Sequence, residues 1–458
     1  MDKTQIDDFK TQLFAAAQTA GFSAYEIYYA GGVSFSAKVR DQQVEEYKNT
    51  ASSGLSFRGL YQGNMGYAYS EHIDPSAIDF IVNAARDNAT IKENNDEHLF
   101  AGSEHYPHPR PISDKLDEPT SDQKIAWLKT MEAHAKTLDP RVQAVDYCFI
   151  SSGTGDVYIA NSHGLNLYRE SGNATSYIGV RVSEGESVKV GFKVWRGHDF
   201  DTYDPKAVAA EAVERAINML GAKSIPTGDY AVIIENRGMV ALLSTFMGNF
   251  FAESVQKGFS LLKDKVGTAI ASPNITIHDN LAHPLSFSQA TFDSEGVAVR
   301  DKVVVDKGVL KTYLYNLKAA HVEGRESTGN GYKPSFKASV NTDINNFFIA
   351  PGETAIDQLM GDFTGVVIDD FMGLHAGANT TSGDFSLQAN GFLYEKGQLV
   401  HAVEQITLAG NFYELLKQVD TVADDLYFSP WSTVGSPSLL VSGLKISGEG
   451  HEPTTEAV

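Results

Sequence analysis

The sequence is poor in cysteine and has no long apolar run. The single cysteine, Cys148, excludes an internal disulfide and any zinc site built from several cysteines. No apolar stretch reaches the roughly 18 residues that a membrane-spanning helix needs. The first ten residues, MDKTQIDDFK, are too polar for a secretory signal. These absences predict a cytoplasmic protein that does not enter a membrane.

Basic residues are scarce relative to acidic ones. The 458-residue chain has 37 Lys and Arg residues against 58 Asp and Glu residues, which gives a formal net charge of −21. No cluster of basic residues interrupts this acidic excess. Because an acidic surface repels phosphate groups, we expect the protein to bind neither nucleic acid nor an anionic membrane.

Common catalytic motifs are also missing. The sequence has no G-x-x-x-x-G-K-[ST], no G-x-G-x-x-G after a strand, no H-E-x-x-H and no G-x-S-x-G. Cys148 lies in the apolar run VDYCFI, which is typical of a buried structural cysteine. His105 and His108 stand among prolines that forbid a regular helix, so we interpret them as loop residues without a metal.

A pair of carboxylates in the segment FDSEG, Asp293 and Glu295, is a weak catalytic candidate. Two carboxyl groups in a polarising site can divide the roles of acid and base between them. The segment ends a strand and continues with a glycine, however, which is typical of a turn. We therefore expect a turn with solvated acids here.

The N-terminal half contains a repeated pattern. A helix, antiparallel strands and a second helix are predicted over roughly 5–90 and again over 121–220. Residues 91–120 between them are polar and contain four prolines, which is typical of a linker. We predict an α+β fold whose N-terminal domain, 1–222, consists of duplicated α-β-β-α units with an antiparallel sheet.

The C-terminal half has shorter strand patterns separated by glycine-rich stretches. We predict a β-rich domain over 223–448 that carries one apolar helix near 240–251, and a polar tail over 449–458. Most of the helix reads as a core-facing apolar stripe, formed by Leu242, Leu243, Phe246, Met247, Phe250 and Phe251.

Several segments together resemble the TldD/PmbA family, known as modulators of DNA gyrase and as metallopeptidase components. The resemblance covers nearly the whole chain. It rests on the strand and helix at 229–251, FDSEGVAV with its hairpin, the STGN loop at 327–330, GLHAGANTTSGDFSLQANGFLYEKG, ITLAGN at 406–411 and the closing GSPSLLVSGLKISG.

The resemblance implies a metal-binding helix in one branch of the family. In the TldD branch this helix carries H-E-x-x-x-H, whose histidines bind zinc together with a later cysteine while the glutamate acts as the base. Here those positions hold Ser244, Thr245 and Asn249, and the segment FSPWSTV, where the cysteine is expected, has none. Hydroxyl and amide groups are poor zinc ligands. The chain therefore looks like the PmbA branch, also called TldE, and is expected to have no catalytic residue, no metal and no cofactor.

The spacing of the motif adds a geometric expectation. Residues five apart on a helix differ by about 140° in direction, so the helix must end or distort between the two histidine positions. Gly248 is the residue that would permit this distortion, although a close-packing role for it is an equal alternative.

The partners are also implied by the resemblance. TldD-type and PmbA-type chains are thought to form a heterodimer that hydrolyses unfolded or extended peptides, with zinc only in the TldD-type subunit, and the isolated chain is expected to form a homodimer. An extended peptide is best held at a free strand edge. Our candidate contacts lie in one glycine-rich loop, for which a purely structural turn is an equal alternative: Gly373, His375, Gly377, Asn379, Ser382 and Asp384.

Two other functions stay open at this stage. One is a self-contained hydrolase with an unrecognised site, for instance His375 with Asp293 or Glu404. The other is a non-enzymatic modulator that binds another protein. The family is enzymatic, but this chain is expected to be inactive alone because the zinc-binding positions are lost.

Overall fold

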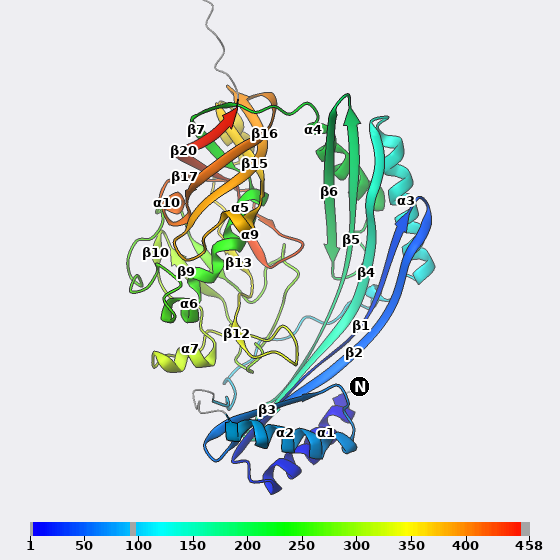
Figure 1. The fold of residues 1–458 in the computed structure, drawn as a ribbon, viewed down its shortest axis with the longest axis vertical. Coiled ribbons are helices and arrows are strands. Elements are labelled where there is room, and N and C mark those ends of the chain that lie inside the picture. The colour runs from blue at the N-terminus through cyan, green and yellow to red at the C-terminus, as the bar shows by residue number, and fades with distance from the viewer. Residues whose placement is uncertain (1–2, 92–97, 450–458) are drawn as a thin grey trace, which may run out of the picture.

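The computed structural model describes residues 3–91 and 98–449. A long, strongly curved sheet (blue to green in Figure 1) stands opposite a more compact part (green to red). Helices and antiparallel strands are mixed in both parts, which confirms the predicted α+β class. No helix in these residues is long and apolar enough to cross a membrane.

The N-terminal sheet has six strands in the order β3-β2-β1-β4-β5-β6, and every neighbouring pair is antiparallel. Each predicted unit contributes three strands, one more than the α-β-β-α pattern, and β1–β4 pairing joins the two units into one sheet. The strands are β1 (Ala24–Arg40), β2 (Gln43–Tyr61), β3 (Asn64–Ser70), β4 (Val142–Asn161), β5 (Asn166–Glu184) and β6 (Ser187–Gly197).

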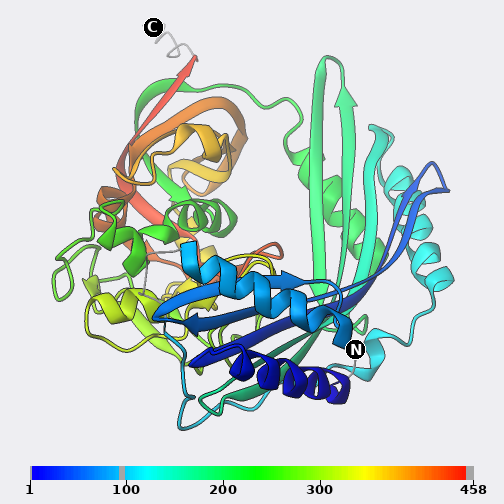
Figure 2. The same ribbon diagram turned by 60° about the horizontal axis from the view of Figure 1, so that its bottom comes forward.

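Four helices cover one face of this sheet. They are α1 (Lys3–Thr19), α2 (Ile78–Ile91), α3 (Ser121–Leu138) and α4 (Pro205–Asn218), with α1 and α2 at one end of the sheet and α3 at the other in Figure 2. In β1, Ile27 belongs to the core under the first helix pair and Phe35 to the core under the second. Alternate residues of a strand share a face, so both pairs lie on the same side and the other side is turned to the C-terminal part.

Small residues occupy the part of the sheet between the two helix pairs. Gly32 in β1 lies opposite Gly155 in β4, Gly31 precedes it, and Gly153 lies two positions from Gly155, opposite Ser34. A Cβ atom on Gly153 would lie 2.4 Å from the carbonyl oxygen of Val33, so no side chain fits there. The missing side chains let the strands bend, as the curvature in Figure 1 shows.

The predicted linker, 91–120, runs along the molecule between the two units. Residues 98–113 have no regular structure, 92–97 lie outside the described residues, and the segment ends at Thr120, whose capping box with Gln123 starts α3. Tyr106 Oη donates a 2.7 Å hydrogen bond to the Gly296 carbonyl, so the segment also contacts the C-terminal part.

The C-terminal part contains a closed barrel. Strand β16 pairs with both β15 and β20, and the pair β7–β14 is parallel, an exception to the antiparallel rule. The barrel strands are β7 (Pro226–Ile234), β14 (Gly365–Met372), β15 (Asp384–Glu395), β16 (Gln398–Asn411) and β20 (Leu439–Glu449), with β17 (Val419–Val422) added to β20. Residue 449 of the predicted tail thus belongs to a strand, and 450–458 lie outside the described residues.

A second, mixed sheet packs beside the barrel in the order β10-β9-β8-β13-β19-β18. Its strands are β8 (Ile277–Asp279), β9 (Lys302–Asp306), β10 (Val309–Leu310), β13 (Phe347–Ile349), β18 (Tyr427–Phe428) and β19 (Val434–Ser436). A separate two-stranded sheet is formed by β11 (Gly331–Tyr332) and β12 (Asn341–Thr342).

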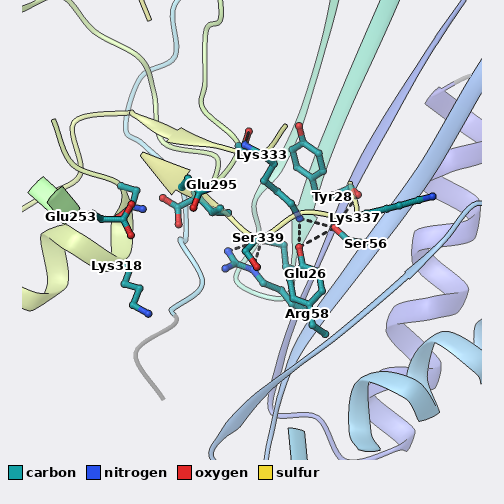
Figure 3. Close-up of a pocket in the computed structure, with 15 residues that line it drawn as sticks. Glu26, Tyr28, Ser56, Arg58, Glu253, Glu295, Lys318, Lys333, Lys337 and Ser339 are labelled. Atoms are coloured by element: carbon teal, nitrogen blue, oxygen red, sulfur yellow. Dashed lines mark hydrogen bonds and ion pairs between the residues drawn. The ribbon is translucent and has the colours of Figure 1, made fainter. Parts of the chain in front are cut away.

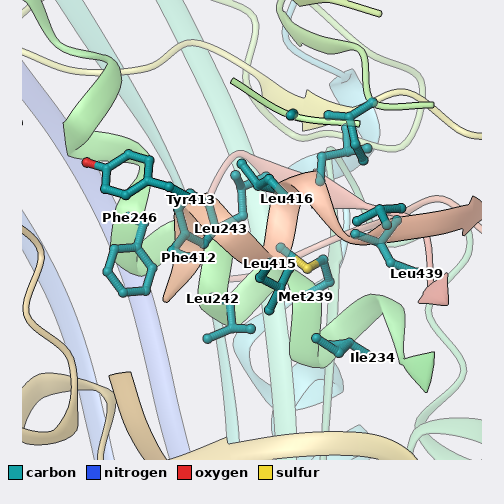
Figure 4. Close-up of a cluster of buried hydrophobic side chains, with 14 of the residues drawn as sticks. Ile234, Met239, Leu242, Leu243, Phe246, Phe412, Tyr413, Leu415, Leu416 and Leu439 are labelled. Carbon is teal, nitrogen blue, oxygen red and sulfur yellow. The ribbon is translucent and has the colours of Figure 1, made fainter. Parts of the chain in front are cut away.

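The apolar helix predicted near 240–251 is α5 (Asn236–Phe246), which a short 3-10 helix (Met247–Phe250) continues. Leu242, Leu243 and Phe246 lie in one buried cluster with residues of the helix α10 (Phe412–Lys417), and the Phe246 ring stacks on Phe412 with centroids 4.6 Å apart (Figure 4). The core interpretation of this stripe is confirmed. The other helices here have at most six residues: α6 (Ala252–Gln256), α7 (Leu317–Val322), α8 (Ile356–Met360), α9 (Leu374–Gly377) and α10 (Phe412–Lys417).

Candidate functional site

A groove separates the edge of β6 from the C-terminal part. Seven consecutive β6 residues, 190–196, line a cavity of about 580 Å³ opposite α5, β14 and the segment 427–431. Successive residues of a strand point to opposite faces, so only the strand's edge can place all seven beside one cavity. Among the described strands β6 pairs with β5 alone, so its edge lies open to the groove except at Phe192, whose carbonyl accepts a 3.1 Å hydrogen bond from Arg215 Nη1.

A second cavity of about 500 Å³ continues the groove along the inner face of β5. It shares Arg196, Phe287 and Trp431 with the first cavity. The rest of its lining comes from β5, Met247 and the segments 287–294, 329–332, 343–345 and 432–433. We call the two cavities together the interdomain groove. Trp431 stacks on Phe192 of β6 across it, with ring centroids 6.3 Å apart.

The three positions of the metal-binding motif lie at different depths beside this groove. Ser244 lines it, whereas Thr245 turns its hydroxyl back to the Ala241 carbonyl at 2.9 Å. Asn249 is buried, only 2% exposed. The α-helix ends at Phe246, between the two histidine positions, as the spacing argument requires. The hydroxyl of Ser244, the hydrogen-bonded hydroxyl of Thr245 and the buried amide of Asn249 are poor zinc ligands, so these positions do not fit a zinc ion.

Metal ligands are not grouped elsewhere in the part of the chain that the structure describes. No three His, Cys, Asp or Glu side chains in 3–91 and 98–449 lie together so that they could hold a metal ion. Trp431 occupies the segment where the family's cysteine is expected, and its side chain is 59% exposed.

Gly248 has neither of its two predicted roles. A Cβ atom there would meet nothing within 4 Å, so the close-packing explanation is wrong. Its φ is not positive, so the change from α-helix to 3-10 helix does not require glycine either.

The predicted peptide contacts lie together around α9, but they mainly hold their own loop. Asn379 accepts hydrogen bonds from the backbone N–H groups of Thr381 and Ser382, and Ser382 Oγ donates to Asp384 Oδ2 at 2.7 Å. Gly373 has φ 75°, and a Cβ atom on Gly377 would lie 2.5 Å from a backbone oxygen. These contacts favour the structural alternative for five positions. The sixth, His375, is exposed.

The alternative hydrolytic site is not assembled. Glu404 forms an ion pair with Lys189 of β6, and Asp293 accepts hydrogen bonds from three backbone N–H groups. Within the described residues no hydrogen bond joins His375 to either carboxylate. The geometry therefore does not support a His–Asp or His–Glu pair here.

The prediction that Asp293 and Glu295 are solvated is wrong. Their side chains belong to the buried polar residues, with exposures of 6% and 3%, because backbone N–H groups of Gly331 and Leu317 come close enough to donate to them. Burial raises the pKa of Asp293 to about 6 and that of Glu295 to about 8. Glu295 lines a cavity beside the N-terminal sheet, whereas Asp293 lines the cavity along β5.

Glu295 lines a polar cavity of about 440 Å³ between the N-terminal sheet and the segment 331–341. Figure 3 shows Lys333 reaching down toward Ser56, to which its Nζ donates at 2.8 Å. Arg58 forms a buried ion pair with Glu26, with a nitrogen–oxygen distance of 2.7 Å. The bond from Lys333 to Ser56 joins the C-terminal part to β2, so this cavity lies at a contact between the two parts.

The start of α5 carries a charged cluster that the sequence did not reveal. Arg237 pairs with Asp369 of β14, and both line the groove. Burial and the neighbouring Asp369 raise the pKa of Glu235 to about 8, so its carboxyl group stays largely neutral at pH 7. Asp369 is 132 positions from Arg237 in the chain, so no local motif could have signalled the cluster.

The sequence predictions for Cys148, His105 and His108 agree with the structure. Cys148 is fully buried and burial raises the pKa of its thiol, which makes it inert. Both histidines are exposed in the segment without regular structure.

Three family models match successive parts of the chain. The PmbA/TldA metallopeptidase domain 1 matches residues 25–89, the central domain matches 114–220 and the C-terminal domain matches 227–448.

Curated relatives match over nearly their whole length. The metalloprotease PmbA homolog of Haemophilus influenzae is 27% identical over 94% of this chain and 94% of its own. Metalloprotease PmbA of Escherichia coli O157:H7 is 25% identical over 93% of this chain and 92% of its own.

Solved structures have the same fold. A Thermotoga maritima protein described as a modulator of a DNA gyrase is 30% identical, with a TM-score of 0.89 over 96% of this chain and 100% of its own. TldE from Thermococcus kodakarensis is 23% identical with a TM-score of 0.89 over the same shares, a likeness that concerns the fold alone.

Proposed function

The chain belongs to the PmbA/TldD metallopeptidase family, and on this premise we propose that it is the metal-free, non-catalytic subunit of a cytoplasmic protease complex. Its partner would be a TldD-type chain that carries H-E-x-x-x-H and the zinc. The observation that carries the proposal is the site beside the groove, where Ser244, Thr245 and Asn249 cannot replace two histidines and a glutamate.

The interdomain groove supports a role in holding unfolded or extended peptides. Residues 190–196 of β6 present an edge that no other described strand pairs with, over about 23 Å at about 3.3 Å per residue. A peptide added as a further strand is bound through its backbone, so its sequence matters little. Phe192 and Trp431 give the walls apolar surface for its side chains.

The test is reconstitution with a TldD-type partner. We expect no cleavage of casein or of an unfolded peptide by this chain alone, and chelator-sensitive cleavage when the partner is added. The matched control is a partner in which the glutamate of H-E-x-x-x-H is replaced by glutamine, which should abolish cleavage by the mixture.

Two results would contradict the proposal. Cleavage by the purified chain alone would show that it has its own active site. One zinc ion per chain, measured by elemental analysis, would show that it is not metal-free. Light scattering completes the test, since we propose a homodimer when the partner is absent and a heterodimer when it is present.

A further inference from the structure

The guanidinium of Arg169 in β5 is buried, and the carboxyl group of Asp293, which attracts it, does not pair with it. Its Nε is buried without a hydrogen-bond partner, and its recorded contact is with the ring face of Phe292, 5.4 Å from the guanidinium carbon. It forms no ion pair within residues 3–91 and 98–449, and burial lowers its pKa. Burying an unpaired guanidinium costs free energy. An anion that binds beside the guanidinium offsets this cost, so such an arginine is suited to bind an anion.

Arg196 of β6 repeats this arrangement farther along the groove. Its Nη1 donates to the Pro430 carbonyl at 3.0 Å, its guanidinium lies 5.3 Å from the Phe287 ring, and its Nε is buried without a partner. Burial also lowers the pKa of this arginine. The cavity along β5 therefore has an arginine lying over a phenylalanine ring at each of two points.

Both arginines point to the same face of the sheet. Arg196 is paired with Thr175, which is six residues from Arg169 along β5 and so has the same orientation. Six residues correspond to about 20 Å of extended chain. A peptide that passes Arg196 can therefore reach Arg169 after about six residues.

Two acids also line this cavity from the C-terminal part, Asp293 and Asp343. The carboxyl group of Asp293 is bonded to three backbone N–H groups, and Asp343 accepts from the N–H of Ile344. Asp293 attracts Arg169 but forms no ion pair with it, and its carboxyl oxygens accept from those N–H groups instead. The other polar groups around them are neutral hydroxyls and amides of Ser171, Asn173, Asn330 and Asn345.

From this geometry we propose that the Arg169 end of the interdomain groove is a carboxylate-binding subsite. It selects peptides that place an acidic side chain or a free C-terminus about six residues beyond the segment held at Arg196. The inference rests on the proposed peptide-holding function. With a net charge of −21 the rest of the surface disfavours acidic peptides, so the selection is local to these arginines.

The experiment measures peptide binding by fluorescence anisotropy to the full chain, alone and with its partner. The probes are four labelled unstructured 12-residue peptides that differ only at the end: a glutamate or a glutamine, each with a free or an amidated C-terminus. We expect the fully neutral peptide to bind at least tenfold more weakly than the fully acidic one. Loss of the preference on amidation alone identifies the C-terminus, and loss on replacing glutamate alone identifies the side chain.

The variant Arg169→Gln should bind all four peptides alike, with the affinity that the wild type has for the neutral one. Arg181→Gln is the matched control, because Arg181 lies on the same strand, is exposed and pairs with Asp146. It should keep the wild-type preference. Arg169→Lys retains the charge and should keep part of the preference for acidic peptides. It replaces Arg169→Gln as the test variant if the glutamine variant does not fold.

The results separate this inference from the proposed function. Equal binding of acidic and neutral peptides to the wild type overturns the subsite and leaves the peptide-holding role intact. An equal loss for all four peptides in Arg169→Gln also overturns it, since Arg169 would then only shape the groove. Failure of every peptide to bind the chain or the complex overturns the proposed function itself.

Discussion

Glu295 shows how a single carboxyl group couples the contact between the two parts to pH. Its side chain is buried in the polar cavity, where its Oε2 accepts a 2.7 Å hydrogen bond from the N–H of Leu317. Its pKa is raised from 4.5 to about 8, first by burial and then by the neighbouring Asp293. The folded state therefore prefers the protonated form. The stability that this group contributes is fully present below pH 4.5 and is lost as the pH rises to about 8.

The variant Glu295→Gln should gain stability over the wild type as the pH rises. Glutamine keeps an acceptor for Leu317 but cannot ionise. Each pKa unit corresponds to about 1.4 kcal/mol, so we expect a relative gain on the order of 1 kcal/mol or more between pH 5.5 and pH 8. Thermal unfolding midpoints at both pH values check this.

The exposed Glu186 in the turn between β5 and β6 provides the control for this experiment. Glu186→Gln should follow the wild type at both pH values. If the unfolding midpoint of Glu295→Gln also changes with pH as that of the wild type does, Glu295 is ionised in the folded protein and its assignment as a neutral acid fails.

At the scale of the elements, a glycine in the last strand of each N-terminal unit lets that strand pack closely against the last helix of the unit. A Cβ atom on Gly66 of β3 would lie 1.9 Å from the Ala85 carbonyl oxygen in α2. A Cβ atom on Gly191 of β6 would lie 2.0 Å from the Ala212 carbonyl oxygen in α4. The equivalent placement supports the interpretation of the two units as a duplication.

Gly66→Ala and Gly191→Ala should each destabilise the protein, because the added methyl group forces the helix away from the strand. Overpacking of this kind costs about 1–3 kcal/mol. We expect lower thermal unfolding midpoints for both variants. Gly248→Ala is the control with open space around the new methyl group and should be unchanged or slightly stabilised. A midpoint at the wild-type value for either strand variant would contradict the close approach.

Local signals account for the parts of the fold that were predicted. The hairpin turns have positive φ at Lys307 and Gly308, and at Lys396 and Gly397, and a glycine in such a turn is a local hairpin signal. Closure of the barrel through β16 and β20 and burial of Asp293 were not predicted, since both depend on residues far apart in the chain. Arg169 was missed because one arginine in an alternating strand has no local signature.

For the whole molecule, we expect the thermal stability of the chain not to depend on a metal ion, and this can be measured. A ligand at 100 times its dissociation constant stabilises the native state by about 2.7 kcal/mol. Since Ser244, Thr245 and Asn249 do not fit zinc, we expect neither added zinc nor a chelator to change the thermal unfolding midpoint of this chain.

A TldD-type chain that carries H-E-x-x-x-H is the matched control for the metal experiment. Its unfolding midpoint should fall in the presence of a chelator and recover when zinc is restored. A rise in the midpoint of this chain with equimolar zinc would contradict its assignment as the metal-free subunit.

The pairing of β1 with β4 has a consequence for how the protein is made. Glu26 in β1 lies beside Asn161 in β4, 135 residues later, and the other edge of β1 is already covered by β2. At about 5–20 residues per second, a ribosome needs roughly 7–27 s to synthesise that interval. During this time a 17-residue strand has an open edge. The nascent chain should therefore bind chaperones most strongly before β4 emerges, and a chain halted near residue 120 should aggregate.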